Sequence, residues 1–180
     1  MGDVFSIPEP YQVDLAVAQF LQGFQIGRFH DLMEFVSFLG DPLPRIILLI
    51  LITFLVFLKS RRNGFFVAVS TSGAVVLSII IKHLVDRDRP IATLVHDSFP
   101  SGHVLFFVGL FGSLLFLSYT MPHRNFYRFL LIMFFTLILI LIGISRIYLG
   151  AHWFSDVIGA YLIGLFWLLV IIKIYKHTNN

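Results

Sequence analysis

Long apolar runs separated by short polar stretches dominate the chain. Five of them approach the roughly 20 apolar residues that an α-helix needs to cross the hydrocarbon core of a bilayer. The predicted spans are Leu43–Leu58, Phe65–Leu84, Val104–Met121, Phe129–Ile144 and Val157–Ile172. Aromatic and basic residues at their ends extend the shorter runs into the membrane interface. The pattern therefore predicts an all-α fold, a polytopic transmembrane helical bundle of about five spans.

The segment Tyr11–Leu39 has a different pattern, because polar residues interrupt it too often for a span. Its apolar residues recur at helical spacing: Leu15, Ala18, Leu21 and Phe24, then Leu32, Phe35, Val36 and Leu39. A helix with one apolar face lies in the plane of the interface. We therefore expect one or two amphipathic interfacial helices, with a partly polar sixth span as the alternative. Residues 1–180 are expected to form one domain, with N-terminal helices over 11–39 and a transmembrane core over 43–175.

Composition also indicates a membrane protein. Of the 180 residues, 58% are hydrophobic and only 13% are charged, whereas soluble domains are about 45–50% apolar and about 25% charged. The basic residues are scattered between apolar runs, so the bilayer rather than nucleic acid is the expected partner. The chain has no cysteine, which excludes disulfides, thiolate catalysis and cysteine-ligated metal sites. The stretch MGDVFSIPEP lacks the basic and apolar regions of a signal peptide, so none is expected.

The loops predict an orientation. One set carries most of the loop cations: Lys59, Arg61, Arg62, Arg124, Arg128, Lys173 and Lys176. The positive-inside rule places this set in the cytoplasm. The other set also contains cations (Arg28, Arg45, Lys82, Arg87, Arg89 and Arg146), so the margin is small unless some of these serve a site. We expect a multi-pass protein of the plasma or inner membrane, with the second set on the extracytoplasmic face.

Three polar clusters lie in that second set of loops. They are KHLVDRDRP (Lys82–Pro90), PSGH (Pro100–His103) and SRIYLGAHWFSD (Ser145–Asp156). If the spans alternate in direction, all three clusters meet at one membrane face. Charged residues near the membrane are costly and usually functional, so this face is the predicted site.

The cationic residues of these clusters predict a phosphate site. Lys82, Arg89 and Arg146 lack an equal number of nearby carboxylates, and guanidinium groups match phosphate oxygens. Ser101 and Gly102 lie where a helix begins, and the unpaired backbone N–H groups there also favour phosphate. Such a cage stabilises the charge that a phosphoryl group spreads over its oxygens during transfer.

Two histidines complete the predicted chemistry. His152 and Asp156 are spaced i, i+4, which places them on one helix face if the last span begins near Ala151. A carboxylate bound to one ring nitrogen leaves the other nitrogen free to attack phosphorus. His103, across the anion, can protonate the leaving oxygen. The hypothesis is a covalent phosphohistidine mechanism that requires no metal and no other cofactor.

The three clusters, as K-x6-R-P, P-S-G-H and S-R-x5-H-x3-D, resemble the signature motifs of the type 2 phosphatidic acid phosphatase (PAP2) superfamily of lipid phosphatases. By this resemblance His152 is the nucleophile, His103 the general acid and Asp156 the partner of His152. The resemblance assigns phosphate binding, without a metal, to Lys82, Arg89, Ser101, Gly102 and Arg146. Membrane members of the family often have six spans, whereas here the first is missing or reduced to the amphipathic region.

The expected activity is hydrolysis of a lipid phosphate or diphosphate. Undecaprenyl diphosphate is the preferred substrate, because the layout resembles short bacterial undecaprenyl-diphosphate phosphatases and an outward site suits recycling of that carrier. Phosphatidylglycerophosphate and phosphatidic acid are the alternatives, since the motifs recognise phosphate rather than the lipid tail. A non-catalytic anionic-lipid-binding protein is the alternative from another class. A small channel or transporter does not explain why the polar residues cluster at one face.

Several other polar residues receive simpler interpretations. Asp41 is expected to cap the first span, and Arg87 to anchor its loop at lipid headgroups. Asp86 and Asp88 are expected to moderate the cationic loop without a catalytic role. The remaining histidines are expected to face the interface or solvent and not to bind metal: His30, His83, His96, His123 and His177.

Overall fold

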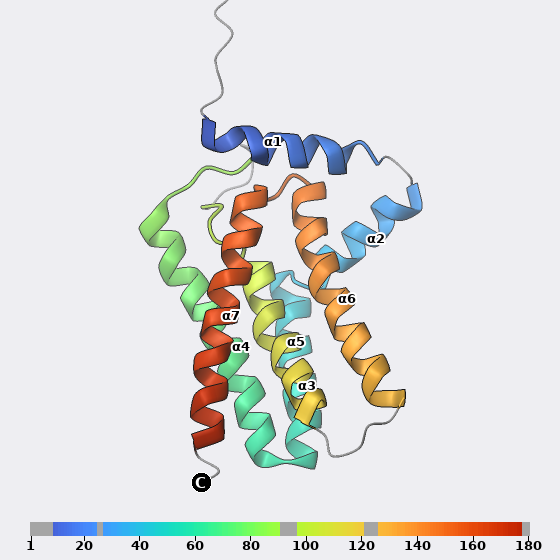
Figure 1. Cartoon of the computed structure of the whole chain (residues 1–180), viewed down its shortest axis with the longest axis vertical. Helices are drawn as coiled ribbons and strands as arrows, with labels where there is room; N and C mark the ends of the chain where they lie inside the picture. The colour runs from blue at the N-terminus through green and yellow to red at the C-terminus, as the bar shows by residue number, and fades with distance from the viewer. Residues whose placement is uncertain (1–8, 25–26, 91–96, 121–125, 178–180) are drawn as a thin grey trace, which may run out of the picture.

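A computed structural model of the chain describes residues 9–24, 27–90, 97–120 and 126–177 (Figure 1). His96, His123 and Arg124 lie outside these ranges. Within them the chain forms helices α1 (Glu9–Gln22), α2 (Gly27–Phe38), α3 (Pro42–Lys59), α4 (Arg61–Val85), α5 (Gly102–Thr120), α6 (Phe126–Tyr148) and α7 (Phe154–His177). No strand occurs in the described residues, so the prediction of an all-α fold is confirmed.

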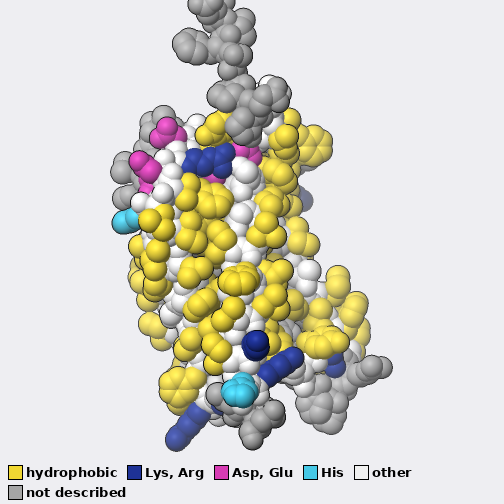
Figure 2. Space-filling view, turned by 60° about the vertical axis from the view of Figure 1, so that its left-hand side comes forward, with side chains coloured by type: hydrophobic (Ala, Val, Ile, Leu, Met, Phe, Trp, Pro, Cys, Tyr) yellow, Lys and Arg dark blue, Asp and Glu magenta, His cyan; other side chains and the backbone are white. Residues whose placement is uncertain are grey.

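Helices α3 to α7 are the predicted transmembrane spans. Each is long and apolar enough to cross a bilayer. Four of the predicted runs lie wholly within these helices, and the third prediction reaches Met121, which is outside the described residues. The helices add polar or aromatic ends to the predicted runs, as α6 does with Tyr127, Arg128 and Tyr148. An apolar belt separates two charged ends of the molecule (Figure 2), so the chain is a multi-pass membrane protein.

The N-terminal region forms two short helices, and a sixth span is not found among the described helices. Helix α1 lies across one end of the bundle, roughly perpendicular to the long helices, and α2 leans against α6 (Figure 1). Val17, Ala18 and Leu21 of α1 face the core, as does Val36 of α2. Periodicity therefore predicted both helices, but the face predicted for α2 was only partly right: Val36 is buried, whereas Leu32 and Phe35 are exposed and Met33 is buried instead.

Helix α5 is the centre of the bundle, where it contacts α4, α6 and α7. Leu105, Phe106, Phe107 and Leu110 are fully buried along it. It approaches α4 closely at Gly109, where an added Cβ would lie 2.8 Å from the Thr71 Cα. Small residues allow helices in membranes to pack at such distances. The close contact fixes the start of α5 relative to the end of α4.

The start of α5 is recessed inside the molecule. In Figure 1, α5 begins below the end of α6 and the beginning of α7, on the side that α1 covers. Ser101, immediately before α5, is fully buried. The PSGH cluster therefore lies beneath the surface, with the other two polar clusters around it.

Candidate active site

The first turn of α5 meets the last turn of α4. The backbone carbonyl of Ser101 accepts the first helical hydrogen bond from Leu105 at 3.1 Å, so Ser101 directly precedes the helix. A Cβ on Gly102 would lie 3.2 Å from the Ser78 Oγ and 4.0 Å from the Lys82 Cε. The backbone at Gly102 therefore runs beside the Lys82 side chain. The buried Ser101 Oγ has no hydrogen-bond partner among the described residues, which leaves it available to an anion.

Three cationic side chains from three parts of the chain lie near the start of α5. Lys82, at the end of α4, donates to the Asp97 carbonyl, and Arg89 donates to the Ala151 carbonyl at 3.0 Å. Arg146, at the end of α6, donates to the Ser37 Oγ. The three charges repel one another. Burial lowers the pKa of the Arg89 guanidinium, and the carboxylates of Asp156 and Asp97 oppose that shift. The three cations thus lie close enough together to bind one anion between them, with the carboxylates of Asp97, Asp156 and Asp41 nearby.

His152 lies in the turn between α6 and α7. Gly150 adopts a left-handed conformation at φ 67°, which glycine accepts without steric cost. The turn brings the backbone N–H of His152 to 3.1 Å from the Arg146 carbonyl, where it donates. The imidazole is 2% exposed. Burial, with Arg146 and Arg89, lowers the pKa of His152 to about 4 against the opposing effect of Asp156, so this imidazole is neutral at neutral pH.

The side chains of His152 and Asp156 lie side by side, but not on one face of a helix as the sequence analysis expected. Helix α7 begins at Phe154 rather than near Ala151, so His152 precedes the helix and Asp156 is in its first turn. The Asp156 Oδ2 accepts a hydrogen bond from the Trp153 N–H at 2.9 Å and lies 3.6 Å from the His152 Nδ1. The buried Nδ1 has no closer hydrogen-bond partner in the described part of the chain. A small rotation of either side chain would form the bond.

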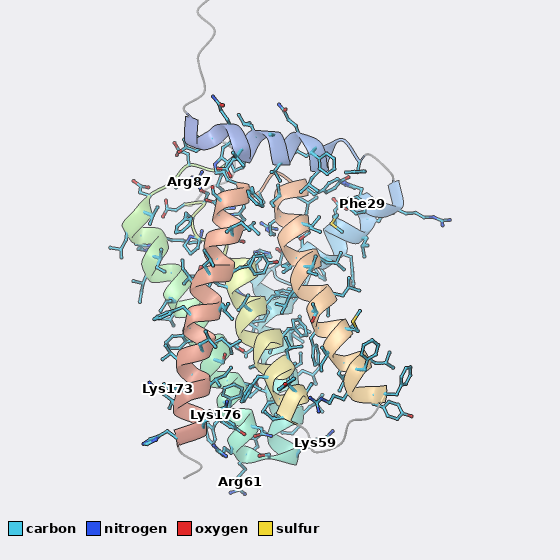
Figure 3. All side chains as sticks on the ribbon, viewed as in Figure 1. Phe29, Lys59, Arg61, Arg87, Lys173 and Lys176 are labelled. Carbon is cyan, nitrogen blue, oxygen red and sulfur yellow. The ribbon has the colours of Figure 1, made fainter. Side chains whose placement is uncertain are left out.

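The position of Arg87 contradicts the prediction that this residue anchors its loop at lipid headgroups. It does not extend toward lipid headgroups but lies under α1 at the start of α7 (Figure 3). Its guanidinium donates to the Asp156 Oδ1 at 2.6 Å, to the Ser155 Oγ at 2.7 Å and to the Asp14 Oδ2 at 2.8 Å. Burial alone would lower its pKa, but Asp156 and Asp14 outweigh burial and raise the pKa of Arg87. Removing one partner of a buried ion pair costs about 3–5 kcal/mol, so Arg87 joins α1 firmly to the start of α7 beside the site.

Asp14 is a site residue that the sequence analysis missed. Its side chain is 2% exposed, although it belongs to the predicted interfacial region. A signal was present, since Asp14 falls one turn before Ala18 on the apolar face of α1. A charged residue on the buried face of an amphipathic helix needs a buried partner. Arg87 and Ser155 supply it.

The position of Asp41 contradicts a second prediction, that this residue caps the first span. It precedes α3, but its side chain makes no capping hydrogen bond, and Pro42 removes one N–H that a cap would satisfy. The Asp41 Oδ1 instead lies 3.3 Å from the Nε2 of His103. His103 also packs against Gly40, where an added Cβ would be 2.2 Å from the imidazole Cδ2. The junction of α2 and α3 therefore holds the candidate general acid, which interacts electrostatically with His152 and Arg146.

The polar clusters thus meet as expected, with all eight predicted site residues around the start of α5. The family model of the PAP2 superfamily matches residues 63–179, which include all three motifs. The chain belongs to the PAP2 superfamily. Asp14, Ser37 and Asp41 lie before the matched region, so α1, α2 and the junction of α2 and α3 supply site contacts that the PAP2 motifs do not contain.

A PAP2 relative and two solved structures are similar to the chain. Phosphatidylglycerophosphatase B of Bacillus subtilis (strain 168) is 35% identical over 94 residues, which cover 49% of this chain and 46% of that protein. The match thus spans less than half of the relative. The crystal structure of the first transmembrane PAP2 type phosphatidylglycerolphosphate phosphatase from Bacillus subtilis aligns over 96% of this chain and 89% of that chain, at TM-score 0.81 and 21% identity. The crystal structure of Aquifex aeolicus LpxE aligns over 93% of this chain and 99% of that chain, at TM-score 0.71 and 18% identity.

The other described histidines lie outside the PAP2 site. His83 and His177 are exposed, as predicted. His30 is half exposed but has partners that the sequence analysis did not find, at 3.3 Å from both the Tyr148 hydroxyl and the Glu34 carboxylate. Exposed pairs of this kind contribute about 0–1 kcal/mol. No group of side chains in the described ranges has the composition of a metal centre.

Proposed function

We propose that the chain is a metal-independent lipid phosphatase that acts through a phosphohistidine. One observation carries the proposal: a buried, neutral imidazole at His152 lies beside the Asp156 carboxylate, within the electrostatic reach of Arg89, Arg146 and His103. A nucleophile held by an orienting carboxylate and facing anion-binding groups is the arrangement that phosphoryl transfer through nitrogen requires.

The steps follow from these positions. Asp156 accepts the Nδ1–H of His152, and Nε2 attacks phosphorus while the bond to the leaving oxygen breaks. His103 gives its proton to that oxygen, and Lys82, Arg89, Arg146, Ser101 and the Gly102 N–H stabilise the three equatorial oxygens. A water molecule then attacks phosphorus and loses a proton to His103 as the phosphorus–nitrogen bond breaks. Inorganic phosphate leaves, and both histidines return to their starting states.

Phosphatidylglycerophosphate is the substrate that we propose first. The sequence analysis preferred undecaprenyl diphosphate, but the named relative and one of the similar structures are phosphatases of phosphatidylglycerophosphate. Their names support the alternative better than the first preference. Undecaprenyl diphosphate and phosphatidic acid remain the comparison substrates, because the site groups address phosphate and not the lipid tail.

We propose further that the site faces the extracytoplasmic side of the cell membrane. Lys59, Arg61, Lys173 and Lys176 lie at the end of the bundle opposite Arg87 (Figure 3), and the positive-inside rule assigns that end to the cytoplasm. The chain has no cysteine, so single cysteines at Arg61 and Asp31 can be labelled in intact cells with a membrane-impermeant maleimide. Labelling of Asp31→Cys alone supports this orientation, and labelling of Arg61→Cys alone reverses it.

The activity is tested by phosphate release in detergent from the three lipids. We expect the wild-type protein to act best on phosphatidylglycerophosphate and His152→Ala to lose turnover. His83→Ala, which changes an exposed histidine at the end of α4, is the matched control and should resemble the wild type. Wild-type turnover by His152→Ala would exclude the histidine nucleophile. Lipid binding without turnover by the wild type would favour the non-catalytic alternative.

A further inference from the structure

Helix α1 places a buried carboxylate against the start of α7. The Asp14 Oδ1 accepts a hydrogen bond from the Ser155 N–H at 2.7 Å, and its Oδ2 accepts one from the Ser155 Oγ at 2.6 Å. The first backbone N–H groups of a helix have no partner within that helix. Asp14 therefore satisfies one of them, the N–H of Ser155, from a different helix and only three residues after His152.

The Arg87 guanidinium joins Asp14 to Asp156. One of its nitrogens is 2.6 Å from the Asp156 Oδ1, and the other is 2.8 Å from the Asp14 Oδ2. Asp156 is fully buried and its second oxygen, Oδ2, is the one beside His152. Arg87 therefore holds one oxygen of Asp156 and leaves the other for the imidazole. Asp14 in turn fixes the end of Arg87 that Asp156 does not hold.

Aromatic contacts hold α1 over this network. The ring of Tyr11 meets the ring of Trp153 edge-on with centroids 5.6 Å apart. The Arg87 guanidinium lies 5.0 Å from the centroid of the Tyr11 ring and 6.0 Å from that of Trp153. Arg87 is thus enclosed by two rings and two carboxylates, a geometry that planar guanidinium suits and lysine does not.

We propose that Asp14 and Arg87 are positioning residues for phosphoryl transfer, acting through Asp156 on His152, so that docking of α1 completes the active site. The inference rests on the proposed function. Arg87 is a poor candidate for the phosphate cage itself, because its nitrogens are engaged by Asp14, Ser155 and Asp156. Its loss should therefore affect the chemical step rather than the binding of substrate. The same holds for Asp14, which reaches His152 only through Arg87 and the start of α7.

The test compares kcat and KM for Asp14→Asn and Arg87→Lys on the best lipid substrate. Asparagine keeps the shape of Asp14 but turns an N–H group toward a guanidinium or hydroxyl that donates there, so the link to Arg87 is lost. We expect kcat to fall by about ten- to hundredfold, as for supporting residues elsewhere, with KM unchanged. Arg89→Lys, in the phosphate cage, should raise KM. Asp31→Asn, on the exposed face of α2, is the matched control and should not change either constant.

Two further variants separate positioning from folding. If Asp14 acts through Arg87, the double variant Asp14→Asn with Arg87→Lys should lose about as much kcat as Arg87→Lys alone, because residues in one network are not additive. Asp14→Glu, which keeps the charge, should recover part of the loss. Thermal unfolding in detergent identifies variants that fail to fold. A lower melting temperature with undiminished kcat in both single variants would show that α1 has only a structural role and would overturn the inference. A wild-type protein without turnover would instead overturn the proposed function.

Discussion

The Nε2 of His103 lies 3.3 Å from the Oδ1 of Asp41, so the candidate general acid is paired with a carboxylate at the start of α3. Asp41 is half exposed, whereas His103 is 15% exposed. A charged pair open to water on one side contributes little to stability. We therefore interpret the contact as a support for proton donation by His103. When one N–H of the imidazolium donates to Asp41, the other remains for the leaving oxygen.

We predict that Asp41→Asn lowers kcat without lowering the melting temperature. The amide keeps the shape of Asp41 but cannot balance the positive charge of an imidazolium, so proton transfer from His103 to the leaving oxygen should be less effective. General acid catalysis contributes about 10²–10⁴-fold, and a supporting carboxylate should account for about tenfold of it. Phosphate release from the lipid measures the loss. An aryl phosphate with a leaving group that needs no proton should be hydrolysed at nearly the wild-type rate, and an equal loss on both substrates would contradict the role.

The burial of His152 predicts the acid limit of activity. Burial first, and then Arg146 and Arg89, lowers its pKa to about 4, against Asp156, with His103 facing it from α5. Only the neutral imidazole attacks phosphorus. Protonation of His152 should therefore reduce kcat/KM near pH 4, well below its ordinary pKa of about 6.5. A pH profile of lipid hydrolysis in non-ionic detergent measures it. A loss centred at pH 6.5 that moves in Arg89→Lys would contradict the buried, neutral state.

The imidazole of His152 should also make the stability of the fold depend on pH. The folded pKa of His152 lies below its unfolded value, so between about pH 6.5 and about pH 4 the unfolded chain binds more protons than the folded one. Stability should therefore decrease as the pH falls through this window and stop changing through His152 below it. Thermal unfolding of the wild type and His152→Ala across these pH values measures the difference. Parallel curves for the two proteins would show that His152 contributes no such dependence.

Local patterns in the sequence were sufficient to predict the spans and to select the motif residues. Apolar run length determines where a helix can cross a bilayer, so the spans were predicted closely. The motif residues Lys82, His103 and His152 lie at or between the ends of spans that alternate in direction, which brings them to one face. The residues that support them could not be found in this way, because Asp14 and Arg87 are 73 residues apart and only the docking of α1 brings them together. Asp41 was assigned to a cap because the N-terminal position is visible in the sequence, whereas His103 is a neighbour only in three dimensions.

We predict that chelation leaves activity unchanged. In the proposed mechanism Lys82, Arg89 and Arg146 balance the charge of the transferring phosphoryl group, the task that a metal ion performs in other phosphatases. Treatment with EDTA followed by gel filtration, and then phosphate release with and without added Mg²⁺, measures it. Equal rates are expected throughout. Loss of turnover after EDTA with recovery on adding Mg²⁺ would contradict the mechanism.

Gly40 supports His103 by the absence of a side chain, and the substitution Gly40→Ala should therefore impair catalysis more than folding. Its Cβ would be 2.2 Å from the imidazole Cδ2, far inside van der Waals contact, so the ring must move away from its position beside Asp41. We expect kcat for the lipid to fall by about 10²-fold or more, since general acid catalysis is lost, with only a small change in melting temperature because a side chain rather than backbone yields. Gly27→Ala is the matched control, because an added Cβ at Gly27 meets no described atom within 4 Å. Wild-type turnover by Gly40→Ala would mean that His103 does not need this position to act.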